Sequence, residues 1–203
     1  IEELIENWEL FARREDLHPI IQTAVLHAQF EMIHPFLDGN GRMGRLLITL
    51  FLASKKILHT PCLYISAYLQ RHRGAYYASL AKISKNNDWN TWISFFLRAV
   101  VEHSKANASL LMKMTDLYEI SKTQFAEATN SSLAMELLDY LFAQPIFTVP
   151  NLINQTKVKA SKATLLLAVQ KLEKAGLVTK ISEGRGRRPT VWKFGALVDL
   201  IQD

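Results

Sequence analysis

The residues of this chain that are best suited to chemistry lie in one stretch, His34 to Arg45, which reads His-Pro-Phe-Leu-Asp-Gly-Asn-Gly-Arg-Met-Gly-Arg. Gly39 and Gly41 can take backbone conformations that other residues adopt only at a cost. A loop of this kind at the start of a helix turns several N–H groups toward one point, which suits an anion. We therefore expect an anion-binding site at the backbone of Gly39, Asn40 and Gly41.

Four side chains of the stretch could act together with this anion-binding site. Arg42 and Arg45 are three residues apart, so a helix that begins at about Gly41 places both on one face. Each guanidinium group can donate two hydrogen bonds at once to a phosphate. Asp38 offers carboxylate oxygens that suit Mg2+ together with phosphate oxygens. His34, with an unperturbed pKa of about 6.5, is a candidate general base. The combination predicts transfer of a phosphate-containing group to a nucleophile.

The stretch resembles the signature of the Fic family, His-Pro-Phe-x-Asp/Glu-Gly-Asn-Gly-Arg-x-x-Arg, at every specified position. Fic proteins are mostly transferases that move AMP from ATP to a Ser, Thr or Tyr hydroxyl of a protein and release pyrophosphate. The resemblance therefore implies a helical catalytic domain, ATP and Mg2+ as cofactors, and a protein substrate, which can be the enzyme itself.

The resemblance also implies a role for each signature residue. His34 would take the proton from the target hydroxyl, and Asp38 would hold the Mg2+ that bridges the α- and β-phosphates. Arg42 would grip the phosphates, and Arg45 would contact the γ-phosphate. The backbone of residues 39–41 would form the anion hole.

Three aromatic residues near the motif are given expectations of their own. Tyr76 belongs to a Tyr-Tyr pair that lies near the adenine in Fic relatives, which implies a nucleotide contact; packing alone is the alternative. Phe36 is expected to be a core anchor that fixes the loop. His27 could share a metal with His34, but we favour a helix-packing role for it.

Composition limits the classes of protein that this chain can represent. The 203 residues carry a formal net charge of +5 and are 49% hydrophobic, enough for a substantial core. A single cysteine, Cys62, excludes an internal disulfide and fits a cytoplasmic location. The longest apolar run, residues 46–53, is too short to span a bilayer, so no membrane partner is expected. The chain starts inside a helical pattern without Met, which suggests a fragment of a longer protein.

The pattern of apolar residues predicts a mainly α fold in two parts. A truncated, all-helical Fic domain is expected over residues 1–106, with a helix from Pro19 to about Ile33 and another that Asp88 caps. A connecting helix and linker are expected over residues 107–131.

Residues 132–203 predict a small α+β domain. A helix, a short helix and a third helix that Ser161 caps precede two strands, at about 177–181 and 189–194. This order resembles the winged helix-turn-helix domains that follow the catalytic domain in many bacterial Fic proteins.

Basic charge is concentrated in that second part. Residues 145–193 hold ten Lys or Arg and two Glu, which is the electrostatic footprint of nucleic-acid binding. The alternative is a domain that docks a protein or a second copy of the chain in a homodimer. The candidate DNA contacts are Lys157, Lys159, Lys162, Arg185, Arg187 and Arg188.

Two other functions stay open beside AMP transfer. One is a DNA-binding transcriptional regulator whose Fic domain only senses nucleotide. The other is a Fic transferase that uses another donor. We favour AMP transfer, because the residues that the chemistry needs are intact and the Gly-Asn-Gly-Arg form is the one associated with nucleotidyl transfer.

Overall fold

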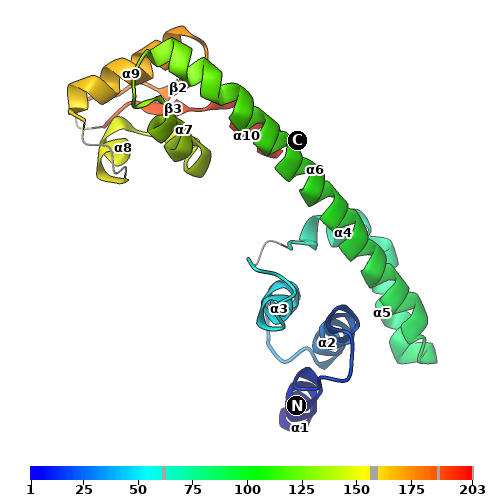
Figure 1. Cartoon of the computed structure of the whole chain (residues 1–203). Helices are drawn as coiled ribbons and strands as arrows, with labels where there is room; N and C mark the ends of the chain where they lie inside the picture. Colours follow the sequence, from blue (N-terminus) through cyan, green and yellow to red (C-terminus); the bar gives the residue numbers. More distant parts are fainter. Residues whose placement is uncertain (61–62, 156–159, 187, 203) are drawn as a thin grey trace. The chain divides into compact units, whose positions relative to one another are not determined.

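The computed structural model describes residues 1–60, 63–155, 160–186 and 188–202. The chain is mainly helical, as expected, and it divides into two compact units, Ile1–Asn107 and Ala108–Asp203 (Figure 1). Helix α6 (Trp89–Thr129) contributes to both units. Within the described ranges, no helix has the length and apolarity needed to cross a membrane.

Five further helices lie in the described residues of the first unit. They are α1 (Glu2–Ala12), α2 (Pro19–Ile33), α3 (Asn40–Ser54), α4 (Ser66–Arg71) and α5 (Arg73–Asn86). The expected starts of two helices are confirmed: Pro19 is the first residue of α2, and the Asp88 carboxylate accepts a hydrogen bond from the Thr91 N–H at 3.1 Å.

Helices α2, α3 and α6 enclose the core of the first unit. Trp92 and Phe96 of α6 are fully buried among Ala24 of α2 and Ile48 and Leu52 of α3. The Trp92 indole donates a hydrogen bond to the Ala24 carbonyl at 2.8 Å, so the ring is fixed in orientation as well as in depth. This core sets the position of α2 against α3, the two helices that carry the motif.

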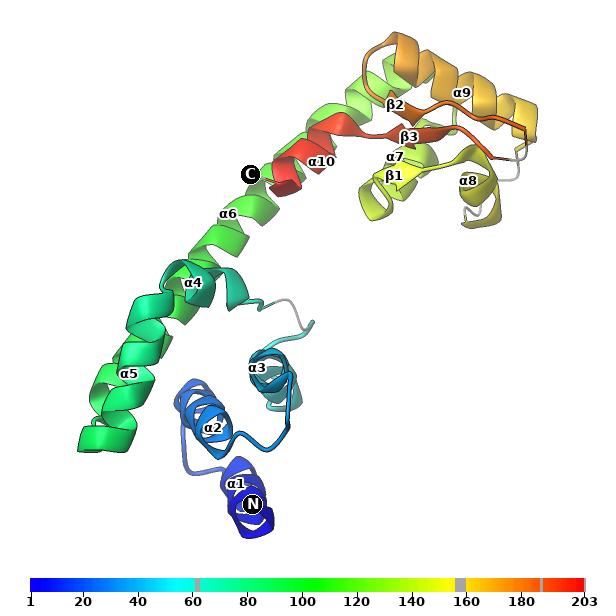
Figure 2. The same ribbon diagram turned by 180° about the vertical axis from the view of Figure 1, so that it is seen from behind.

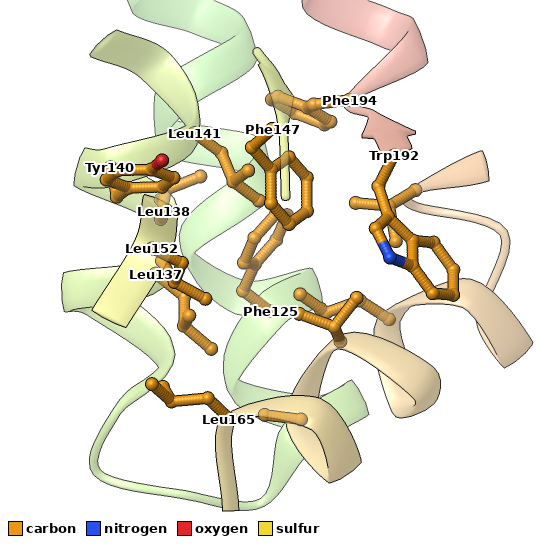
Figure 3. Close-up of a cluster of buried hydrophobic side chains, with 14 of the residues drawn as sticks. Phe125, Leu137, Leu138, Tyr140, Leu141, Phe147, Leu152, Leu165, Trp192 and Phe194 are labelled. Carbon is orange, nitrogen blue, oxygen red and sulfur yellow. The ribbon is translucent and has the colours of Figure 1, made fainter. Parts of the chain in front are cut away.

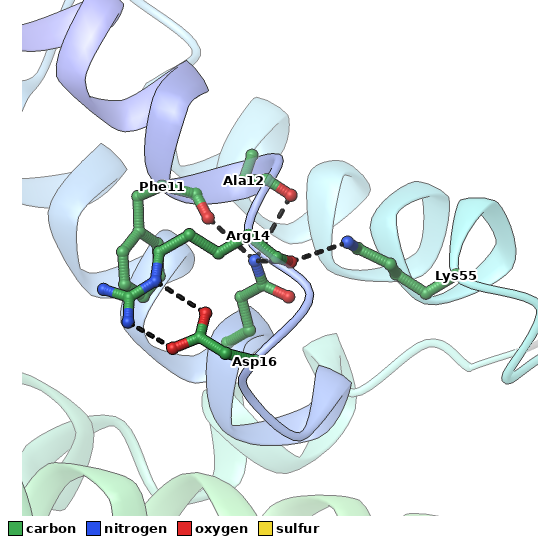
Figure 4. A network of polar contacts seen from close by, with 6 residues as sticks. Phe11, Ala12, Arg14, Asp16 and Lys55 are labelled. Atoms are coloured by element: carbon green, nitrogen blue, oxygen red, sulfur yellow. Dashed lines mark hydrogen bonds and ion pairs between the residues drawn. The ribbon is translucent and has the colours of Figure 1, made fainter.

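A polar network closes the turn between α1 and α2 (Figure 4). The last carbonyls of a helix have no partner inside the helix. The buried Gln22 amide donates to the carbonyls of Phe11, Ala12 and Arg14, at 2.7, 3.2 and 3.0 Å. Lys55, which follows α3, donates to the Arg14 carbonyl at 3.0 Å, so the turn is tied to both motif helices.

The second unit combines helices with a small sheet (Figure 2). Its elements after α6 are α7 (Ala134–Ala143), β1 (Ile146–Phe147), α8 (Val149–Gln155), α9 (Lys162–Lys174), β2 (Thr179–Ser182), β3 (Val191–Lys193) and α10 (Gly195–Gln202). The sheet has the order β1-β3-β2, and both pairs are antiparallel. Ser161 caps α9 as expected, because its hydroxyl accepts a hydrogen bond from the Thr164 N–H at 3.1 Å.

The second half of α6 is part of the core of the second unit (Figure 3). Phe125 of α6 is fully buried, and its ring lies 5.6 Å from that of Phe194, edge against face. Leu138 of α7 and Leu165 of α9 are also fully buried in this cluster. This stretch of α6 therefore does more than connect the two units: it supplies one wall of the second.

Candidate active site

The motif loop joins the end of α2 to the start of α3. His34 is the C-terminal cap of α2 and has the left-handed conformation, φ 52° and ψ 56°. A residue other than glycine is rarely found there, and such backbone strain is concentrated at functional sites. The His34 side chain is exposed. The chain therefore turns at a strained backbone position at His34, and the imidazole of this residue is accessible to solvent.

Asn40 holds the loop closed through its side chain. Its amide oxygen accepts a hydrogen bond from the Phe36 N–H at 2.9 Å, and its amide nitrogen donates to the Phe36 carbonyl at 2.6 Å. The Asn40 side chain is buried. Both polar groups of the Phe36 backbone are therefore satisfied inside the loop. From the sequence, only the backbone of Asn40 was expected to have a role. The two side-chain hydrogen bonds to Phe36 are an additional structural role of this residue.

Gly39 is the turning point that starts α3. Its φ of 85° is left-handed, and α3 begins at the next residue. The Gly39 N–H donates to the Asp38 carboxylate at 2.7 Å. Asp38 also forms an exposed ion pair with Arg42 at 3.5 Å. An exposed pair of this length is weak, so both groups can exchange it for a ligand.

Phe36 departs from its expected role. Its side chain is 49% exposed, so the expectation of a buried core anchor is wrong. The ring still lies 6.2 Å from that of Phe30. The reason is that Asn40 already fixes the backbone of Phe36, so the loop does not need the side chain as an anchor.

The two motif arginines line different hollows. Side chains of an α-helix lean toward its N-terminus. Arg42 leans back over Gly39, and it lines a hollow with Asp38. Arg45 leans back over Gly41, and it lines a second hollow with Tyr76. Both guanidinium groups therefore approach the loop, but from separate sides of the first turn of α3.

Tyr76 is mostly a packing residue in this structure. It is 6% exposed, and its hydroxyl lies 3.1 Å from Nε2 of His27. Burial raises the pKa of the Tyr76 hydroxyl, and the negative charge of Glu31 adds to the rise. The neighbour Tyr77 also lines this hollow and is 55% exposed, and Arg73 lies 5.6 Å above its ring.

Three residues of the second hollow were missed by sequence reasoning. Gln70, Arg73 and Tyr77 line it beside Arg45 and Tyr76. The Tyr-Tyr pair itself was visible in the sequence. Which of the two rings is buried and which is exposed depends on the register of α5 against α2, and no local pattern gives that register.

A metal site made of protein groups alone is absent from the residues that the structure describes. No group of three His, Cys, Asp or Glu there could hold a metal ion. His27 is buried with its ring stacked on Trp92 at 5.9 Å, so its helix-packing role is confirmed. Asp38 alone, with an exposed carboxylate, fits Mg2+ only where phosphates supply the other ligands.

The candidate DNA contacts lie in the second unit. Lys162 is exposed in the first turn of α9. Arg185 and Arg188 are exposed and exchange two backbone hydrogen bonds of 3.1 Å across the turn between β2 and β3. Lys157, Lys159 and Arg187 lie outside the described residues.

Part of this chain is similar in sequence to known proteins. Residues 1–52 match the family model described as Fic/DOC family. A probable protein adenylyltransferase of Aquifex aeolicus is 37% identical over 76 residues, which are 35% of this chain and 23% of the relative. A protein adenylyltransferase Fic of Nematostella vectensis is 30% identical over 125 residues, which are 62% of this chain and 27% of the relative. The N-terminal part of the chain is therefore similar to Fic family proteins.

A solved structure extends the likeness of the fold. A Fic family protein from Desulfovibrio desulfuricans G20 aligns with 95% of this chain and 54% of its own, with a TM-score of 0.53 and 21% identity. The likeness concerns the fold alone. The chain spans less than a third of the length of the two curated relatives and about half of this solved chain.

Proposed function

We propose that the first unit transfers AMP from ATP to a hydroxyl group of a protein. The hydroxyl oxygen would attack the α-phosphorus, the bond from that phosphorus to the bridging oxygen of the β-phosphate would break, and pyrophosphate would leave. His34 would take the hydroxyl proton. The observation that carries this proposal is the strained, exposed His34 next to the start of α3. The first N–H groups of a helix have no partner inside the helix and favour an anion.

The charges around the loop suit this reaction. Transfer of a phosphate-containing group depends chiefly on positioning and on stabilising charge. Arg42 and Arg45 bring two guanidinium groups to the loop from different hollows, which suits a ligand with several phosphates. Asp38 would hold Mg2+ arriving with those phosphates, and the ion would supply neutralisation of their charge.

The second hollow is the best place for the nucleoside. Tyr77 presents an exposed ring there, and Gln70 offers both a donor and an acceptor. An aromatic face binds a base by stacking. The ring of Tyr76 would form part of the wall of this hollow, while its hydroxyl would keep its contact with His27.

Labelled ATP tests the proposed reaction. The protein is incubated with Mg2+ and ATP labelled at either the α- or the γ-phosphate, alone and with cell extract. We expect protein-bound label from the α-position only, and none with His34→Ala. Label from the γ-position would mean phosphoryl transfer. If the unaltered protein neither bound MgATP nor became labelled, the whole proposal would be contradicted.

A second function is proposed for the second unit, as a winged-helix domain that contacts DNA. Its element order, with α7, α8 and α9 and an antiparallel sheet of order β1-β3-β2, supports that class. Arg185 and Arg188 are exposed at the tip of the β2–β3 hairpin, with no acidic partner among the residues described.

One feature of α9 favours a protein partner for that unit instead. Leu166 and Leu167 are 38% and 55% exposed on this helix. An apolar pair on a recognition helix suits a protein surface better than phosphate groups. DNA binding that depends on Arg185 and Arg188 would favour the DNA-contacting role. Its absence would favour a domain that docks a protein, and it would also count against a DNA-binding regulator.

A further inference from the structure

Glu31 is a half-buried carboxylate beside the motif, and the proposed reaction leaves it without a role. It lies on α2 three residues before His34, in the last turn of the helix. Its Oε1 atom is buried and has no hydrogen-bond partner among the described residues. A buried acceptor without a partner is costly, so its presence calls for a physical reason.

The first turn of α3 is shaped to admit this carboxylate. A Cβ atom added to Gly44 would meet Oε1 of Glu31 at 2.6 Å, which is closer than real Cβ contacts. A Cβ atom added to Gly41 would lie 3.9 Å from the same oxygen. Two glycines of the motif therefore leave space on the side of α3 that faces Glu31.

Arg45 approaches the same point from the other side. Its Nη1 atom lies 3.2 Å from the Cβ position of Gly41, the same point that is 3.9 Å from Oε1 of Glu31. Arg45 forms no ion pair with any acid in the part of the chain that is described. Among the described residues, a carboxylate oxygen without a donor and a guanidinium group without an acidic partner therefore lie within 4 Å of one point, although they do not form an ion pair with each other.

The charges around Glu31 are consistent with that pairing. Burial raises the pKa of the Glu31 carboxyl, whereas the positive charges of Arg45 and His34 oppose the rise. The other titratable groups that face Glu31 are His27 and Tyr76. Burial lowers the pKa of His27 to about 4, so it is neutral at neutral pH, and Tyr76 is neutral as well. Arg45 is therefore the permanent positive charge within reach of the carboxylate.

We propose that Glu31 is a positioning residue, whose carboxylate accepts the Arg45 guanidinium and holds it toward the phosphates of the nucleotide. The inference rests on the proposed function for the identity of that ligand. A guanidinium fork can bind a carboxylate on one edge and a phosphate on the other. Held by Glu31, Arg45 loses less side-chain freedom when the ligand binds, which strengthens binding.

The first arm of the test is a double-mutant cycle on MgATP affinity. Glu31→Ala is expected to weaken MgATP binding about tenfold, and Glu31→Gln, which keeps an acceptor oxygen, to weaken it less. In the Arg45→Ala background, Glu31→Ala should have no further effect. Additive losses, or tighter binding by Glu31→Ala, would overturn the proposal, because a merely structural residue acts independently of Arg45. Glu6→Ala, at an exposed position on α1, is the matched control.

The second arm uses the protein without ligand, so it decides the inference even where MgATP does not bind. The Nε–Hε signal of Arg45 is followed by NMR and assigned with Arg45→Lys. We expect Glu31→Ala to shift or broaden it, with the Arg42 signal unchanged. An Arg45 signal that does not respond would refute the positioning role. Absence of MgATP binding by the unaltered protein would instead refute the proposed function.

Discussion

Nε2 of His27 lies 3.1 Å from the hydroxyl oxygen of Tyr76, and this contact joins α2 to α5 beneath the motif. Both residues are buried, and the His27 ring is also stacked on Trp92. The contact fixes the helix that carries Tyr76 against the helix that ends at His34. It also places an ionisable group in the core, with a measurable consequence for stability.

The first prediction concerns that consequence. Burial lowers the pKa of His27 to about 4 in the folded chain, against 6.5 for a free histidine. The unfolded chain therefore takes up this proton at a higher pH than the folded chain does. The free energy of unfolding should fall as pH drops from about 6.5 toward 4, by about 3 kcal/mol for this group. Urea unfolding at a series of pH values measures the slope.

Two variants identify His27 as the source of the slope. His27→Gln keeps a polar group near Tyr76 and removes the titration, so the slope should flatten, whereas His59→Gln, at an exposed position, should leave it unchanged. Glu31 contributes in the opposite direction. Burial raises its pKa, so its stabilising effect is lost as pH rises through the folded pKa. An unaltered slope in His27→Gln would contradict the assignment.

The second prediction concerns Gly44. A methyl group there would meet Oε1 of Glu31 at 2.6 Å, Cδ1 of Phe30 at 3.2 Å and Cε1 of His27 at 3.3 Å. Gly44→Ala should lower the free energy of unfolding by about 1–3 kcal/mol, because the Glu31 carboxylate must move aside and the packed rings of Phe30 and His27 must shift. Gly74→Ala is the matched control: it is helical and has nothing within 4 Å, so it should be neutral or stabilising by up to about 1 kcal/mol. Equal effects of the two changes would rule out the close approach.

The third prediction separates chemistry from binding at His34. His34→Ala should remove AMP transfer and leave MgATP affinity within about threefold, because a general base acts on the target hydroxyl rather than on the nucleotide. Calorimetry measures affinity, and α-labelled ATP measures transfer. Since His34 is exposed, little stability should be lost. If MgATP binding disappeared while the fold was intact, the general-base role would have to be abandoned.

The fourth prediction concerns Asp38. Its carboxylate is exposed, and its partners among the described residues are Arg42 and the Gly39 N–H. Asp38→Ala should therefore reduce the gain in ATP affinity that Mg2+ brings, while ATP binding without Mg2+ should be unchanged or stronger, because a negative charge is removed. Titrations with and without Mg2+ make the comparison. The same gain in both proteins would exclude Asp38 as the ligand.

The fifth prediction addresses the second unit. Replacing Arg185 and Arg188 by Glu should weaken DNA binding and reduce the dependence of affinity on salt concentration, because fewer phosphate contacts release fewer counterions. Fluorescence anisotropy over a range of salt concentrations gives the slope. Lys82→Glu with Lys85→Glu changes the net charge equally, at exposed positions of α5. If that control reduced the slope as much, the contact would be a general charge effect.

Local signals in the sequence were sufficient to predict the motif residues and the starts of several helices. The motif residues, the start of α2 at Pro19 and the caps by Asp88 and Ser161 were predictable, because each depends on backbone groups only a few residues away. The left-handed turn at Gly39 likewise follows from the residue type.

Only the tertiary structure determined that the two motif arginines line different hollows and which residues of other helices pack beside the motif. Arg42 and Arg45 line separate hollows, Tyr76 is buried on His27, and Glu31 lies beside the first turn of α3. These relationships depend on how α2, α3 and α5 pack, and residues far apart in the chain set that packing. No periodicity within one helix contains the information, because the partner surface is on another helix.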